Sequence, residues 1–213
     1  MHHDFDTLID IEQLQDQFAD FHATTGIAAS IISRDGTILD SAGWQNVCVD
    51  FHRKDPAAKW LCVESDMRMN TVLLDGAREA IYQCPHGLMD AAVPILIDDQ
   101  HMANLFSGQF LLDTPDANLI AEFKQRAATY GFDERAYLEA LADAPVITEQ
   151  RVPHILKYLK RLAEMIGELG LSQMRLKERE QALSDAQKRI QRATRRQAKE
   201  THRLTQTLEG SPM

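Results

Sequence analysis

The 213-residue sequence has only three cysteines, Cys48, Cys62 and Cys84. An odd number of cysteines argues against a disulfide framework. No run of eighteen apolar residues is present, which excludes a membrane-spanning helix. The first ten residues, MHHDFDTLID, lack the basic and apolar regions of a signal peptide, so we expect a cytoplasmic chain with free thiols.

Charge is unevenly distributed along the chain. The net charge is −9, which argues against nucleic acid as the main partner. Residues 1–174 carry 27 acidic and 13 basic side chains, whereas residues 175–203 carry 4 acidic and 10 basic ones. Such a basic segment could bind anionic lipid or nucleic acid, but charge on the exterior of a coiled coil is usually a solvated surface, which is the interpretation we favour. The asymmetry indicates two regions with different physical roles.

The first third of the sequence has the pattern of an α+β domain. Apolar residues at helical spacing predict one helix over residues 5–22, ended by the left-handed cap of Gly26. Two strand-like runs then flank Asp35-Gly36, a strong hairpin signal. A helix over 46–53 and a second helix over 56–73, with Asp55 as its cap and Pro56 in its first turn, follow this hairpin.

The middle of the sequence reads as strands and then helices. We expect strands over 79–84, 90–97 and 102–112, of which the last two are joined through Asp98-Asp99-Gln100. Helices are expected over 115–130, capped by Thr114, and over 134–142. The overall class is therefore α+β, with an antiparallel sheet flanked by helices.

A long helix from residue 149 carries the clearest periodicity. Seven of eight positions spaced by seven residues from Ile155 to Leu204 are apolar, and Tyr158, Met165, Ala186 and Ala193 complete much of a second row. Beyond residue 172 the apolar residues are too few to pack on anything but a second copy. The pattern predicts a parallel homodimeric coiled coil; a solitary charged helix is the alternative, but it would be marginal in water.

The cysteines and a nearby histidine form a possible ligand set. Cys48, Cys62, Cys84 and His86 supply the thiolates and imidazole that zinc prefers, and three thiolates could also hold an iron–sulfur cluster. Their spacing matches no compact zinc motif, and small buried core residues are the alternative. No orienting acid or glycine-rich elbow accompanies Cys84, so we do not expect an enzyme.

A joint pattern of these residues resembles the PocR-type sensory domain. The pattern combines Cys48 and Phe51, Cys62 with Ser65-Asp66, Cys84 with Gly87-Leu88, Asp90, Pro94-Ile95 and Gly108-Gln109. It covers about residues 8 to 168, and it departs from the family where Asp98-Asp99-Gln100 replaces a turn that often carries glycine. The resemblance implies a PAS-like bacterial domain that binds a small organic ligand of the diol or hydrocarbon-derivative class and is fused to a signalling output.

A half-wrapped sheet covered by helices would enclose a pocket with apolar walls and a few polar groups. Candidate ligand-binding residues are Trp44, Phe51, Trp60, Tyr82, His86, Met89, Asp90, Phe106 and Gln109. His52 is a further polar candidate, although we expect it on the solvated surface.

These expectations combine into a sensor with three segments. A PocR-like sensor domain would occupy residues 5–168, a coiled-coil signalling helix 169–208 and a short tail 209–213. Ligand binding would shift the helix of a homodimer and so act on an output such as a diguanylate cyclase, a histidine kinase or a DNA-binding domain. The alternatives are a zinc or iron–sulfur redox module using the Cys/His set, and a coiled-coil adaptor with no pocket.

Overall fold

The computed structural model describes the chain over residues 4–209, with side chains over residues 4–199. Its contacts divide the chain into two compact units, residues 1–171 and 172–213. The first unit is an α+β domain built on one five-stranded antiparallel sheet, and the second is the continuation of a long C-terminal helix.

The N-terminal segment forms two helices where the sequence predicted one. Helix α1 covers Phe5–Leu8 and helix α2 covers Ile11–Thr25. The break lies at Asp10, whose side chain accepts a hydrogen bond from the backbone N–H of Gln13 (3.2 Å) and so caps α2. The predicted end is confirmed, because Gly26 adopts a left-handed φ of 71° at the C-cap.

The sheet has the strand order β2-β1-β5-β4-β3 with antiparallel pairing throughout. Its strands are β1 (Ala28–Ser33), β2 (Ile38–Ala42), β3 (Ala80–Gln83), β4 (Met89–Ile97) and β5 (Gln100–Phe110). The turn between β4 and β5 is made by Asp98 and Asp99, with φ values of 51° and 58°. Aspartate tolerates this conformation better than most residues, so the tight hairpin forms without glycine.

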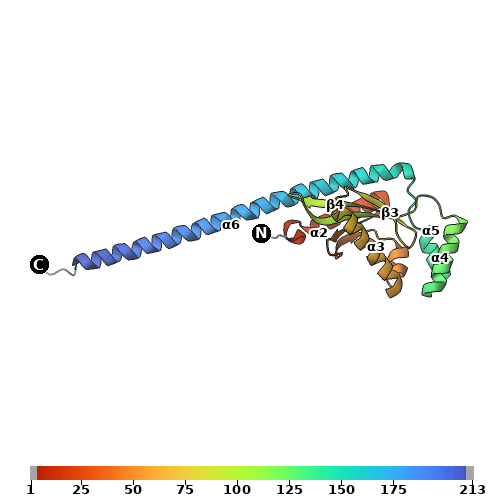
Figure 1. The fold of residues 1–213 in the computed structure, drawn as a ribbon, viewed down its shortest axis with the longest axis horizontal. Coiled ribbons are helices and arrows are strands. Elements are labelled where there is room, and N and C mark those ends of the chain that lie inside the picture. Colours follow the sequence, from red (N-terminus) through yellow and green to blue (C-terminus); the bar gives the residue numbers. More distant parts are fainter. Residues whose placement is uncertain (1–3, 210–213) are drawn as a thin grey trace. The chain divides into compact units, whose positions relative to one another are not determined.

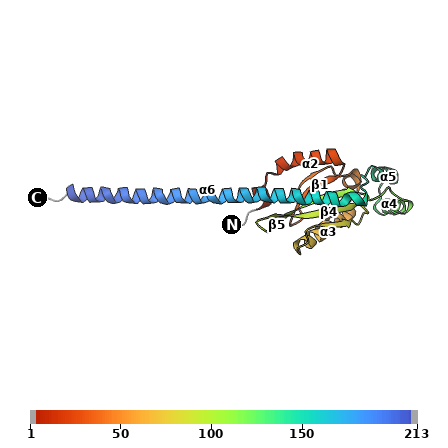
Figure 2. The same cartoon turned by 90° about the horizontal axis from the view of Figure 1, so that it is seen from above.

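Helices cover both faces of the sheet (Figure 1). One face is covered by α3 (Pro56–Leu74), which begins at the predicted cap Asp55. The other carries the first part of α6 (Val152–Glu209), preceded by a short 3-10 turn at Glu149–Arg151. Figure 2 shows α6 crossing over the strands.

Two glycines bring α6 into close contact with strand β4. A Cβ on Gly167 would lie 2.2 Å from the carbonyl oxygen of Leu96, and a Cβ on Gly170 would lie 2.3 Å from the end of the Ile97 side chain. The helix backbone therefore rests directly on the C-terminal end of β4.

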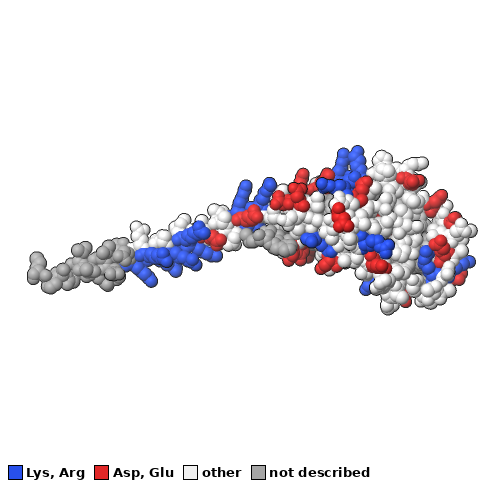
Figure 3. Space-filling model, viewed as in Figure 1, with Lys and Arg blue, Asp and Glu red and all other residues white. Residues whose placement is uncertain are grey.

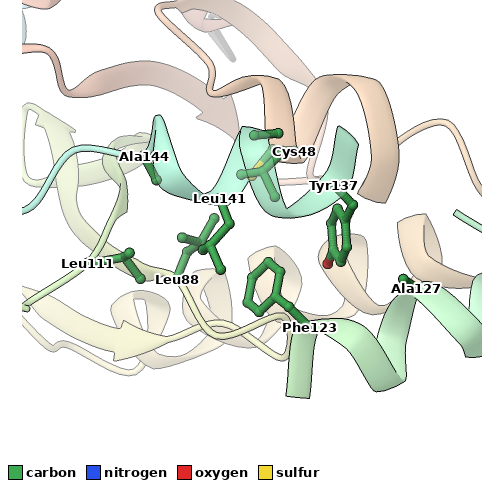
Figure 4. Close-up of a cluster of buried hydrophobic side chains, with 10 residues drawn as sticks. Cys48, Leu88, Leu111, Phe123, Ala127, Tyr137, Leu141 and Ala144 are labelled. Atoms are coloured by element: carbon green, nitrogen blue, oxygen red, sulfur yellow. The ribbon is translucent and has the colours of Figure 1, made fainter. Parts of the chain in front are cut away.

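The remaining helices close one end of the domain. A π-helical turn, η1 (Val47–His52), packs near α4 (Ala117–Tyr130) and α5 (Glu134–Ala142). The cap of α4 is Asp116, whose carboxylate accepts from the N–H of Leu119, and not Thr114 as predicted. Between these elements lies a buried cluster that includes Cys48, Leu88, Phe123 and Tyr137 (Figure 4).

Candidate functional site

A small cavity of about 40 Å³ lies between the sheet, α3 and η1. Its lining comprises Ala28, Ser30, Ile32, Trp44, Cys48, His52, Arg53, Cys62, Ser65, Asp66, Cys84, His86, Leu88, Asp90, Phe106, Ser107, Gly108 and Gln109. The wall is rich in thiols, imidazoles and carboxylates for an interior site. A space of this size is comparable to that of one or a few water molecules.

The three cysteines reach this cavity from three separate elements. Cys48 belongs to η1, Cys62 to α3, and Cys84 follows β3. All three thiols are free. Burial raises the pKa of Cys62 to about 11 and that of Cys84 to about 12, and it raises the pKa of Cys48 well above its usual value. The thiols are therefore protonated at neutral pH, which makes them soft, weakly polar wall groups and poor nucleophiles.

Two buried histidines form the most polar part of the wall. The rings of His52 and His86 stack with centroids 4.0 Å apart and planes inclined by 17°. Nε2 of His86 lies 3.0 Å from the carbonyl oxygen of Ala58, and Nε2 of His52 lies 2.5 Å from the hydroxyl of Tyr137. Burial lowers the pKa of His52 to about 3 and also lowers the pKa of His86, so both rings are neutral.

A paired cation lies on the same wall. Nη2 of Arg53 is 2.9 Å from Oδ2 of Asp66, and its guanidinium lies 4.3 Å from the ring centroid of Trp44. Burial raises the pKa of Asp66 even though the charge of Arg53 opposes the shift. The Trp44 ring, the guanidinium and the carboxylate thus form one stacked and ion-paired group beside the cavity.

The side chain of Asp90 accounts for the Gly108-Gln109 pair in β5. The register of β4 and β5 shifts between Met89 and Asp90, and Gln109 takes a left-handed φ of 61° at this bulge. The N–H of Gln109 donates to Oδ1 of Asp90 (3.1 Å), and a Cβ on Gly108 would lie only 2.0 Å from that same oxygen. Glycine is therefore required for the carboxylate to fit.

The side chain of Gln109 holds the segment that carries Trp44. Its Oε1 accepts a hydrogen bond from the backbone N–H of Gln45 (2.6 Å).

Burial raises the pKa of Asp90 to about 7, with a further contribution from the charge of Asp66. The carboxyl group is thus neutral in much of the population at neutral pH.

Most of the predicted residues meet at this cavity, but not all of them. Trp44, His86, Asp90, Phe106, Gln109 and the three cysteines line it. Phe51 instead packs against Phe132 and Tyr137, Met89 packs in another cluster, and Trp60 is 63% exposed. Tyr82 packs beside Phe106, outside the lining.

Two further lining residues are Arg53, which the sequence did not indicate, and His52, which was only a secondary polar candidate. His52 was expected on the surface, yet it is buried. The π-helical turn is closed by the hydrogen bond from the N–H of Arg53 to the carbonyl of Cys48 (2.9 Å). Its pitch brings Cys48 and His52 to the same side. His52 follows Cys48 by four residues, and this helical spacing was the sequence signal that could have placed His52 at the cavity.

The predicted metal ligands share the cavity without forming a ligand cage. Cys48, Cys62, Cys84 and His86 all line it. Among the described residues, however, no group of three or more His, Cys, Asp or Glu side chains is arranged to hold a metal ion. Nε2 of His86 faces the carbonyl oxygen of Ala58, 3.0 Å away. The donor set in this conformation therefore does not fit a bound metal.

The comparison with family models identifies this architecture. The model of the sensory domain found in PocR matches residues 7–171. The chain belongs to the PocR sensory domain family. The match covers the α+β unit and the start of α6, including every residue of the cavity. No curated protein and no solved structure matches the chain. Within residues 4–209, none of the PocR domain's helices is both long and apolar enough to cross a bilayer.

Proposed function

We propose that this PocR domain senses a small organic molecule that binds in the cavity between α3 and the sheet. The observation that carries the proposal is the convergence of the family-pattern residues on one enclosed space: Cys48, Cys62, Asp66, Cys84 and Asp90 come from four elements and border it together. Polar groups in an otherwise apolar wall are typical of specific ligand sites.

Occupancy requires the cavity to widen. A volume of about 40 Å³ holds little more than water, so the proposal requires a wider form of the cavity than the one described. Two contacts bring the wall together, the Trp44–Arg53 stack and the hydrogen bond between Gln45 and Gln109. A ligand that fits only the wider form shifts the population toward that form, because it binds the two conformations with different free energies.

Strand β4 is the route by which this change reaches α6. Asp90 borders the cavity at one end of β4, whereas Leu96 and Ile97 contact Gly167 and Gly170 at the other end. Strand β4 pairs with β5 from Met89 to Ile97, with a register shift between Ile95 and Leu96, and its first half also pairs with β3, so ladder hydrogen bonds couple its two ends. A displacement at Asp90 is therefore transmitted to the backbone of α6.

The C-terminal unit offers a surface for dimerisation. Leu176, Leu183 and Ile190 recur every seven residues, and their side chains are 49%, 64% and 66% exposed in the single chain. Basic side chains gather along this part of α6 (Figure 3), and one of them, Arg179, lies three residues after Leu176 and so interrupts the second row of the seam. We propose that two chains form a parallel coiled coil here and pass a rotation or register change to an output module such as a diguanylate cyclase, a histidine kinase or a DNA-binding domain.

Sedimentation equilibrium tests the dimer. The full chain is expected to sediment as a dimer at micromolar concentration, and the variant Leu176→Asn/Leu183→Asn as a monomer, since both seam positions become polar. Lys177→Asn/Ser184→Asn, one residue along the helix, is the control and is expected to remain dimeric. A chain that is monomeric before any substitution removes the coiled coil from the proposal.

A further inference from the structure

The buried ring of His52 has one nitrogen without a partner. Five buried side-chain atoms have no hydrogen-bond partner among the described residues, namely Asp40 Oδ2, His52 Nδ1, Tyr82 Oη, His101 Nδ1 and Arg126 Nη1. Of the five residues, His52 alone borders the cavity. A buried polar group without a partner is costly, so an orphaned atom beside a cavity points to an occupant.

The hydrogen bond at the other nitrogen determines what Nδ1 can offer. Tyr137 is fully buried, and its hydroxyl has His52 Nε2 as its partner. If the Nε2 proton were donated to the tyrosine oxygen, the hydroxyl proton would lack an acceptor and Nδ1 would also remain unpaired. If the hydroxyl donates to Nε2, only one group is left unpaired, the N–H at Nδ1. The second arrangement leaves fewer unsatisfied groups, so the ring of His52, which borders the cavity, carries its proton on Nδ1.

The charges of the wall restrict the rest of the ligand. Arg53 is the single lysine or arginine among the lining residues, and Asp66 already neutralises it at 2.9 Å. An anionic ligand would thus bring a buried charge without a free counterion, which is unfavourable. Asp90 already accepts from the N–H of Gln109. Neither the guanidinium of Arg53 nor the carboxyl group of Asp90 is free to receive an ion.

We propose that the Nδ1–H of His52 donates to an oxygen of the bound molecule, so that the cavity selects small uncharged compounds that carry an acceptor oxygen. Tyr137 is a positioning residue that fixes the imidazole tautomer without touching the ligand. This inference rests on the proposed function, because it assumes that the cavity is occupied by an organic molecule.

The tautomer is measured first on the unaltered protein. Long-range ¹H–¹⁵N spectra of histidine-labelled protein distinguish a proton on Nδ1 from one on Nε2. We expect His52 in the Nδ1–H form and His86 in the Nε2–H form. A proton on Nε2 of His52 overturns the inference and leaves the proposed function intact.

Binding is then compared for three probes of similar size: acetone, its planar isostere isobutene, and the cation isopropylammonium. Acetone is expected to shift the His52 Nδ1–H resonance, and the substitution His52→Phe is expected to weaken acetone binding about tenfold while leaving isobutene binding unchanged, since one hydrogen bond is lost. His52→Phe/Tyr137→Phe removes both partners of the buried hydrogen bond and should fold if the single variant does not. His101→Phe is the control, because His101 also has an unpaired Nδ1 but lies outside the cavity lining.

The outcomes separate the two proposals. Equal loss of acetone and isobutene binding in His52→Phe, or preferential binding of isopropylammonium, shows that His52 does not select an acceptor and overturns the inference alone. If none of the probes shifts any resonance of the cavity wall while His52 is the Nδ1–H tautomer, the occupied cavity itself is refuted, and the inference falls with it.

Discussion

The contact between α6 and β4 predicts opposite effects for the same substitution at two glycines. Both Gly167 and Gly170 lie inside α6, where replacing glycine by alanine favours the helix by about 1 kcal/mol. At Gly167 the added Cβ would lie 2.2 Å from the backbone oxygen of Leu96, which cannot move without moving the strand. At Gly170 it would meet Cδ1 of Ile97 at 2.3 Å and Cδ1 of Ile9 at 3.3 Å, which are ends of side chains and can shift more easily than a strand backbone.

The magnitudes decide the sign of each effect. Overpacking against a fixed group costs about 1–3 kcal/mol, so Gly167→Ala is expected to lower the free energy of unfolding by about 1 kcal/mol after the helix gain is subtracted. Gly170→Ala is expected to leave it unchanged or to raise it by up to about 1 kcal/mol. The corresponding change in Tm for Gly167→Ala is a decrease of about 2–4 °C.

Urea denaturation followed by circular dichroism measures both variants against the parent chain. The m-values should be equal, so that the midpoints report stability directly. The helix–strand contact would be refuted if Gly167→Ala were as stable as Gly170→Ala. Such a result would also remove the proposed route from the cavity to α6.

The other predictions concern ionisation and metal content. Because the pKa of Asp90 is raised to about 7 in the folded chain, the folded state binds more protons than the unfolded state between about pH 4 and 7, and the stability contributed by this group falls as pH rises through that window. Asp90→Asn removes the effect, so its stability relative to the parent should increase from pH 4 to 7 by a few kcal/mol; a constant difference in urea titrations would contradict this. The depressed pKa of His52 acts with the opposite sign, so His52→Phe should gain stability relative to the parent as pH falls below about 6.5. Elemental analysis should find less than one zinc or iron per chain, and thiol titration of the unfolded protein should count Cys48, Cys62 and Cys84 as free; one tightly bound metal per chain would restore the metal module.

Local sequence signals predicted most elements of the fold. The Asp35-Gly36 hairpin, the cap at Asp55 and the left-handed Gly26 depend on residues close in sequence, and the structure confirms them. The single predicted helix over 5–22 failed because Asp10 offers a cap inside an apolar pattern that continues past it.

The cavity-facing side of α3 could not be predicted from periodicity. Cys62, Ser65 and Asp66 face the cavity, while Trp60 and Val63 point to solvent. The usual rule that the apolar side of a helix faces inward holds only in part, because Ala58 and Leu73 are buried but α3 also covers a polar cavity. The sequence pattern therefore favoured Trp60 as a wall residue, where the structure places it outside.

The stacking of His52 against His86 was not predicted, for a related reason. His52 and His86 are 34 positions apart, and their stacking depends on the π-helical turn and on Tyr137, which comes from α5. A single polar residue in a short helix gives no sign that a distant ring will cover it. Cys48, Cys84, Asp90 and Gln109 were selected because their joint pattern resembles the family, and they line the cavity; their role in ligand binding stays a prediction.

The most direct test of the account follows the backbone ¹H–¹⁵N spectrum of the full chain while small uncharged compounds are screened. The account predicts that a compound which shifts the indole resonance of Trp44 also shifts the amides of Leu96, Gly167 and Gly170, at the same concentration dependence. Shifts that stay at the cavity while those three amides remain unchanged would contradict the claim that this domain passes ligand binding to α6.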